Sequence, residues 1–317
     1  MAQIENPPLA DVVQRSPFEI LRGVYTVGSL NSPKPCASGA EYVLCWLYDY
    51  SAEQPVWIEE SGTRDLAPGS VRCFEFSPVF VDREQAVPHL VATPLEHEMR
   101  ARSALELMHP REAAIPEDLI RLVHLVHSLQ EPGLVWFLEA LLADAGLRTA
   151  FCTIGANPRH HHSDGGGLLR HSLEVAEAVQ SALGVHPSDS VLEDEAAVVV
   201  ALIHDLGRIR LAEPSAYELY GFHGPSVHEW LLPELVRPVL ATLKHFDTGA
   251  YSALWGTLHA YIHRSRYQNP RVALIQGLDG HSARKDFRGA RSRRYRAPDN
   301  WTPPVGREIA SRDEVGR

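Results

Sequence analysis

Apolar and polar residues alternate over short distances in the first part of the chain. Val, Tyr, Trp, Phe and Leu are frequent in four stretches, which are 20–30, 41–50, 55–60 and 71–82, with turn-forming clusters between them. Short strands joined by turns are typical of a compact β-barrel. The pattern predicts an OB-like β domain over residues 1–90, and the alternative is a small sheet that binds no ligand.

Aromatic residues recur in these predicted strands. They are Tyr25, Trp46, Tyr48, Trp57, Phe74 and Phe76. Rings on the outside of a barrel can stack on nucleic-acid bases, whereas rings on the inside fill the core. We expect most of these rings in the core.

The pattern becomes helical from residue 116 onward. Pro116, followed by Glu117 and Asp118, is a typical helix start, because proline and acidic residues are favoured in the first turn. We expect helices over 116–128, 133–145, 166–183, 190–206, 226–246, 252–264 and 270–289, and some helix around 96–108. The predicted units are a helical connector over 91–132, an all-helical domain over 133–290 and a basic, flexible tail over 291–317. The fold class is therefore mainly α, with a small β-barrel in front.

Composition and charge narrow the functions that the chain can have. The 317 residues are enough for two folded units, and 44% of them are hydrophobic and 22% charged, as in globular proteins. No apolar run is long enough to span a bilayer, no signal-peptide pattern is visible, and the cysteines form no CxxC pair. We therefore expect a cytoplasmic protein with no membrane partner.

Basic residues crowd into one stretch near the C-terminus, although the net charge of −10 is not that of a general nucleic-acid binder. This stretch includes Arg284, Lys285 and Arg288. Such a cluster can follow a phosphate backbone, and the alternative is a solvated tail.

His204 and Asp205 follow the apolar run 198–203. A helix that ends there carries the pair into the interior of the protein. Polar and charged groups are rarely buried unless they are paired or bind a metal ion. The pair therefore predicts a metal centre.

Further histidines strengthen this prediction. His160, His161 and His162 precede a glycine-rich helix entry, and His171 lies in the first turns of that helix. Four histidines within a dozen positions favour metal ligation over coincidence. Imidazole and carboxylate ligands together suit Mn²⁺ or Fe²⁺, and Mg²⁺ less well, as one or two ions.

The order of these residues resembles the HD superfamily of metal-dependent phosphohydrolases, in which the HD pair would be His204-Asp205. Residues 137–142, His161-His162 and residues 166–176 are similar to YhaM-type 3′→5′ exonucleases, which carry an OB-type domain ahead of the HD domain. The triple histidine and residues 228–233 and 278–286 are similar to TraI-type relaxases of the MOBH class, which act in conjugative transfer. The resemblance to HD proteins covers residues 118–288.

The resemblance implies a role for each matching residue. The first metal ion would be bound by His171, His204, Asp205 and Asp279, and a second by His228 and His245, with His161 or His162 lining the site or joining the coordination. Asp205 would be catalytic, with Arg208 and Lys244 positioning phosphates. The charge of the basic cluster, and not the resemblance, makes Arg284, Lys285 and Arg288 candidates for binding nucleic acid.

The resulting hypothesis is a metal-dependent nuclease for single-stranded DNA or RNA, of the 3′→5′ exonuclease or the relaxase kind. A homo-oligomer and proteins of a conjugation or mobile-element system are further partners that it allows. Two alternatives stay open. One is an HD-type nucleotide phosphohydrolase, and the other is a non-catalytic module that keeps the metal and binds nucleic acid.

Overall fold

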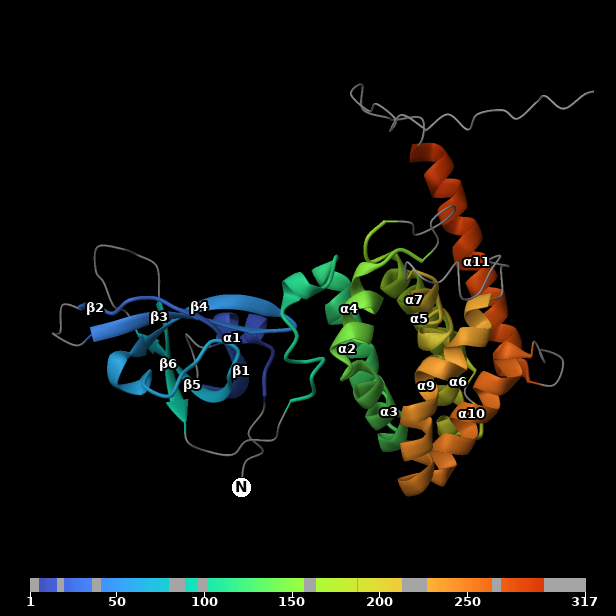
Figure 1. The fold of residues 1–317 in the computed structure, drawn as a ribbon, viewed down its shortest axis with the longest axis horizontal. Coiled ribbons are helices and arrows are strands. Elements are labelled where there is room, and N and C mark those ends of the chain that lie inside the picture. Colours follow the sequence, from blue (N-terminus) through green and yellow to red (C-terminus); the bar gives the residue numbers. More distant parts are fainter. Residues whose placement is uncertain are drawn as a thin grey trace, which may run out of the picture.

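The computed structural model describes residues 6–15, 20–35, 41–79, 89–95, 102–156, 164–186, 188–212, 227–263 and 269–293. Figure 1 shows a β-barrel in blue beside a body of helices in green to red. The predicted order, a β-rich unit followed by helices, is confirmed. Among the described residues, no helix is both long and apolar enough to cross a membrane.

In the described part of the chain, six strands form one sheet. They are β1 (Leu21–Leu30), β2 (Lys34–Pro35), β3 (Glu41–Asp49), β4 (Ala52–Glu59), β5 (Val71–Val79) and β6 (His89–Leu95). Their order is β1-β5-β6-β4-β3-β2, and β1 also pairs with β3, so the five longer strands close into a barrel. The pairs are antiparallel except β4 with β6, which is parallel.

The predicted strands are confirmed as β1, β3, β4 and β5, but β6 was missed. Its residues contain Pro94, and proline weakens a strand prediction because it cannot donate to the sheet. Pairing with β5 along its whole length holds β6 in the barrel nevertheless. Residues 104–107 form a turn, and 102–108 contain no helix, in contrast to the helix expected around 96–108. Residues 96–101 lie outside the described part.

Side chains alternate between the inside and the outside of the barrel. On β3, Val43, Cys45 and Leu47 point inward and are buried, whereas the residues between them are half-buried on the outer surface. The six aromatic rings divide in the same way. Tyr25, Phe74 and Phe76 are fully buried, and Trp46, Tyr48 and Trp57 are half-buried.

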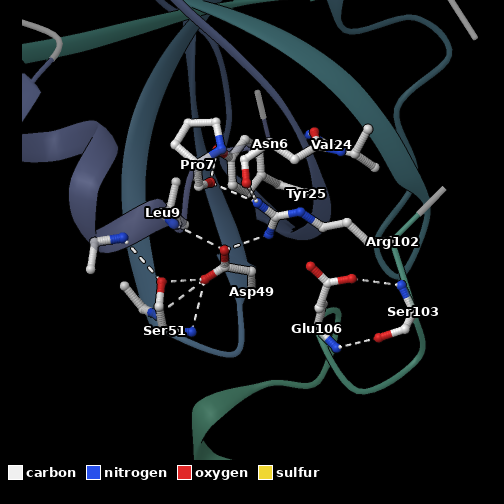
Figure 2. Close-up of polar contacts among 12 residues, drawn as sticks. Asn6, Pro7, Leu9, Val24, Tyr25, Asp49, Ser51, Arg102, Ser103 and Glu106 are labelled. Atoms are coloured by element: carbon white, nitrogen blue, oxygen red, sulfur yellow. Dashed lines mark hydrogen bonds and ion pairs between the residues drawn. The ribbon is translucent and has the colours of Figure 1, made fainter. Parts of the chain in front are cut away.

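A buried ion pair ties the barrel to the chain on both sides of it (Figure 2). Arg102 Nη1 donates to Asp49 Oδ2 at 2.6 Å, and Arg102 Nη2 donates to the carbonyl oxygens of Asn6 and Pro7 at 2.8 and 2.6 Å. Asp49 Oδ2 also accepts the N–H of Leu9, at the start of α1 (Leu9–Arg15), at 2.9 Å. The pair holds the N-terminal segment and the chain after β6 against the end of β3.

The helices begin with α1 and continue after the barrel. They are α2 (Pro116–Ser128), α3 (Pro132–Leu142), α4 (Ala145–Thr153), α5 (Gly167–Val185), α6 (Val191–Ile203), α7 (Arg208–Leu211), α9 (Val227–Phe246), α10 (Thr248–Ile262) and α11 (Pro270–Arg293). Each predicted helix from residue 116 onward is present. The helix predicted over 133–145 ends at Leu142, because Asp144 caps a separate helix, α4, by accepting the N–H of Leu147.

The core of the helical part forms around α6. Every residue of α6 from Glu195 to the last, Ile203, is buried, and α5, α10 and α11 pack on it. A helix that is apolar all round has no face for water, so it takes the centre of the bundle. Its C-terminal end therefore delivers the next two residues, His204 and Asp205, into the interior.

Candidate metal centre

The end of α6 positions the first two residues of the site. His204 is 1% exposed and Asp205 is 2% exposed, as the apolar run predicted. The Nδ1 atom of His204 lies 2.7 Å from the carbonyl oxygen of Ala201, one turn earlier. Because a carbonyl oxygen only accepts, Nδ1 carries the proton and the Nε2 atom faces the site.

Two further helices bring His171 and Asp279 to this pair. Gly166 has a φ of 78°, which glycine adopts without strain, and turns the chain into α5, where His171 is fully buried. Asp279 lies on α11, and its Oδ1 atom is 3.1 Å from His171 Nε2 and 3.8 Å from His204 Nε2. The structure thus joins residues that are far apart in the sequence.

His228, at the start of α9, completes the cluster. Its Nε2 atom lies 2.8 Å from Asp205 Oδ1, while Asp205 Oδ2 faces His171 and His204 at 3.6 and 3.8 Å. Gly207 permits this approach, because a Cβ at that position would overlap the backbone carbonyl of His228. The glycine after the His-Asp pair therefore has a packing role: it lets α9 bring His228 up to the carboxylate.

The spacing of the donor atoms fits a single metal ion. Three ligand atoms, one each from His171, His204 and Asp205, lie within 4.8 Å of one another. Nitrogen and oxygen ligands bind such ions at about 2.1 Å, so two ligands of one ion lie roughly 3–3.5 Å apart. The two histidine Nε2 atoms lie 3.6 and 3.8 Å from Asp205 Oδ2, and 3.1 and 3.8 Å from Asp279 Oδ1, so these separations are close to that range.

The Nε2 atom of His204 gives the strongest indication of a cation. It is buried and makes no hydrogen bond within the described part of the chain, and carboxylate oxygens of Asp205 and Asp279 lie 3.8 Å away. In a neutral imidazole this nitrogen carries an unshared lone pair, since the proton is on Nδ1. A lone pair that faces two carboxylates in a buried site is stable only with a positive charge between them, which is either a proton or a metal ion.

The pKa values of the site follow from this electrostatic arrangement. Burial by itself lowers the pKa of His204, but the carboxylates of Asp205 and Asp279 outweigh burial and raise it to about 9. Burial raises the pKa of Asp205, whereas His204, His228 and Arg208 hold it well below its usual range. Without a metal, a proton on His204 therefore balances the carboxylates at neutral pH, and a metal ion has to displace that proton.

Two other side chains border the cluster. Arg208 Nε donates to Asp205 Oδ2 at 2.7 Å, so the guanidinium is held beside the carboxylate. The ring of Tyr261, from α10, lies edge-on to His204 with centroids 5.9 Å apart, and the residue is 4% exposed. Tyr261 was not predicted, since nothing in its local sequence distinguishes it from a core tyrosine.

His245 and Lys244 are a correction to the expected site. Both are exposed and lie at the C-terminal end of α9, whereas His228 lies at its N-terminal end. At 1.5 Å per residue the two histidines are roughly 25 Å apart along the helix, so they cannot share a metal ion. Lys244 instead lies over the ring of Tyr251, with its Nζ atom 5.4 Å from the centroid.

The remaining predicted residues cannot be assigned to the site. His161 and His162 lie outside the described residues. Arg284, Lys285 and Arg288 lie on α11, beyond Asp279, where the structure describes the helix but not these side chains.

Comparisons with known proteins add no identification. No protein-family model, no curated protein and no solved structure matches the chain. The function therefore has to be inferred from the chemistry of the buried cluster and from the fold that positions it.

Proposed function

We propose that the protein is a metal-dependent phosphodiesterase of the HD type that acts on single-stranded nucleic acid. The observation that carries this proposal is the buried Nε2 atom of His204, which faces Asp205 and Asp279 and has no hydrogen-bond partner among the described residues. His171, His204, Asp205 and Asp279 would hold a first divalent ion. The mixed nitrogen and oxygen donors favour Mn²⁺ or Fe²⁺ over Mg²⁺.

A divalent ion in this cluster would polarise a phosphate oxygen and lower the pKa of a bound water. The side chains have separate tasks around it. Asp205 directs its Oδ2 atom toward His171 and its Oδ1 atom toward His228. The carboxylate is therefore suited to link two neighbouring cation positions. Arg208 keeps its guanidinium at Asp205, where its further N–H groups can bind a phosphate oxygen.

The exposure of the ligands indicates the side from which a substrate approaches. The side chain of Asp279 is 35% exposed, whereas those of His171 and Asp205 are 1% and 3% exposed. Of these three ligands, only Asp279 on α11 is substantially exposed to solvent, which supports an approach of the substrate from that helix. This helix continues into the basic residues Arg284, Lys285 and Arg288, which supports a polyanionic substrate that runs along α11.

The barrel supports the choice of single-stranded nucleic acid. Counting its five long strands in chain order, the closed order is 1-2-3-5-4, with strands 3 and 5 parallel, which is the connectivity of an OB barrel. OB barrels bind oligonucleotides on the face of strands 2 and 3. On that face Trp46 of β3 and Trp57 of β4 are half-buried, and the core is filled without them. Tyr48 of β3 lies on the same face, but its ring packs on His109 with centroids 4.6 Å apart.

The test is cleavage of end-labelled single-stranded DNA and RNA with a series of divalent ions. We expect products with Mn²⁺, and none after replacement of Asp205 by Asn, which keeps the shape of the side chain but removes its charge. His245→Ala is the matched control, because it removes an exposed histidine at the far end of α9.

The pattern of products distinguishes the possible activities. A ladder from the 3′ end indicates an exonuclease, and one internal nick indicates a relaxase. Cleavage of free nucleotides alone indicates a nucleotide phosphohydrolase. Metal binding without any cleavage by the wild-type protein contradicts the catalytic proposal and leaves the non-catalytic, metal-containing module.

A further inference from the structure

The buried hydroxyl of Ser282 joins two helices that carry metal-ligand candidates. The Nδ1 atom of His171 lies 3.3 Å from Ser282 Oγ, and Ser282 Oγ donates to Glu174 Oε2 at 2.8 Å. Ser282 is 7% exposed, so water competes little for these bonds. His171 and Glu174 lie on α5, and Ser282 lies on α11 with Asp279.

The two helices meet in two successive contacts. Glu174 follows His171 by three positions and Ser282 follows Asp279 by three positions, so each pair shares one face of its helix. His171 contacts Asp279 at 3.1 Å, and one turn further along each helix Glu174 contacts Ser282 at 2.8 Å. The contact between Glu174 and Ser282 therefore holds α11 against α5 one helical turn away from the contact between His171 and Asp279.

The direction of the hydrogen bonds determines the tautomer of His171. The hydroxyl hydrogen of Ser282 is used in the bond to Glu174, so its oxygen can only accept from His171. Nδ1 of His171 must then carry the proton, and Nε2, which faces Asp205 and Asp279, keeps its lone pair when the ring is neutral.

We propose that Ser282, supported by Glu174, is a positioning residue that holds His171 in the Nδ1-protonated, metal-binding form and keeps Asp279 in register with it. This inference rests on the proposed metal centre and adds the group that orients it. Partners of this kind behind a histidine ligand change metal affinity by about 10- to 100-fold when they are removed.

The test compares three serine variants. Ser282→Ala removes the acceptor, Ser282→Thr restores a hydroxyl, and Ser172→Ala is the matched control. Ser172 is buried beside His171 on α5, but its Oγ has no hydrogen-bond partner among the described residues. The dissociation constant for Mn²⁺ is measured by calorimetry, and the melting temperature of each metal-free variant shows that it is folded.

A second readout follows the proton itself. In ¹⁵N-labelled protein, with and without Zn²⁺, the Nδ1–H cross-peak of His171 reports whether the ring proton is held against exchange with water. We expect the peak in the wild type, in Ser172→Ala and in Ser282→Thr. In Ser282→Ala the peak should disappear and the Mn²⁺ dissociation constant should rise about tenfold or more.

The outcomes separate this inference from the proposed function. An unchanged dissociation constant or an unchanged His171 cross-peak in Ser282→Ala overturns the role of Ser282. Failure of the wild type to bind any divalent ion contradicts the metal centre, and the cross-peak of the metal-free protein then still decides whether Ser282 holds the ring.

Discussion

The raised pKa of His204 makes the stability of the metal-free protein depend on pH. In the unfolded chain the imidazole has its ordinary pKa of 6.5, and in the folded protein Asp205 and Asp279 raise it to about 9. The folded state therefore binds this proton more tightly than the unfolded state does. The stabilisation is complete below pH 6.5 and is lost as the pH rises toward 9.

The magnitude follows from the two pKa values. Each pKa unit corresponds to about 1.4 kcal/mol, so the interval from 6.5 to about 9 corresponds to a loss of about 3 kcal/mol in the free energy of unfolding. The side chain is 1% exposed, so solvent screens these interactions little. A metal ion binds only the neutral ring. Its apparent affinity should therefore rise with pH, roughly 50-fold between pH 7 and pH 9, as the neutral fraction of the ring increases.

The assay is urea denaturation of the protein in EDTA between pH 6 and pH 9.5, together with Mn²⁺ binding over the same range. His204→Gln is the control, because it carries no titrating group at this position, and only its pH dependence is compared with that of the wild type. The wild type should lose about 3 kcal/mol more than the variant across this interval. Equal pH dependence of the two proteins, or Mn²⁺ affinity that does not rise with pH, would refute the electrostatic argument.

Three other substitutions test separate parts of the structure. Gly207→Ala should lower the stability by about 1–3 kcal/mol and weaken Mn²⁺ binding, because its Cβ would overlap the carbonyl of His228; an unchanged melting temperature and Mn²⁺ affinity would contradict this packing. His245→Ala should leave Mn²⁺ affinity unchanged in calorimetry, and weakened binding would mean that the far end of α9 reaches the site. Asp49→Asn should lower the free energy of unfolding by about 3–5 kcal/mol in urea denaturation, since it leaves Arg102 buried without its counter-charge; a loss below about 1 kcal/mol would show that the pair contributes little.

Local patterns were sufficient for most elements of the fold. The alternation along β3 follows the inside and outside of the barrel, because successive side chains of a strand point to opposite faces. β6 was missed because its placement depends on pairing with β5 and β4, which no local pattern contains. The buried Arg102 was missed for the same reason, since its partner Asp49 lies on a strand far away in the sequence.

The expected second pair of metal ligands, His228 and His245, shows a different kind of error. The predicted helix over 226–246 contains both histidines and agrees closely with α9. Helical geometry alone places them roughly 25 Å apart, so the pairing could have been rejected from the sequence. It came from the order of residues in the HD resemblance, and order along a chain does not define distance in space.

The sequence by itself determined that His204 and Asp205 would be buried, because an apolar run has to end inside a core and carries the next residues with it. It also indicated a glycine-rich entry into the helix that carries His171, whereas the need for Gly207 appeared only in the structure. Only the tertiary structure decided which groups surround the His204-Asp205 pair. These groups come from α5, α9, α10 and α11, and their positions depend on how the helices of this part pack together. The candidate metal ligands could be recognised in the sequence. They form one site only because the packing of the helices brings their side chains together.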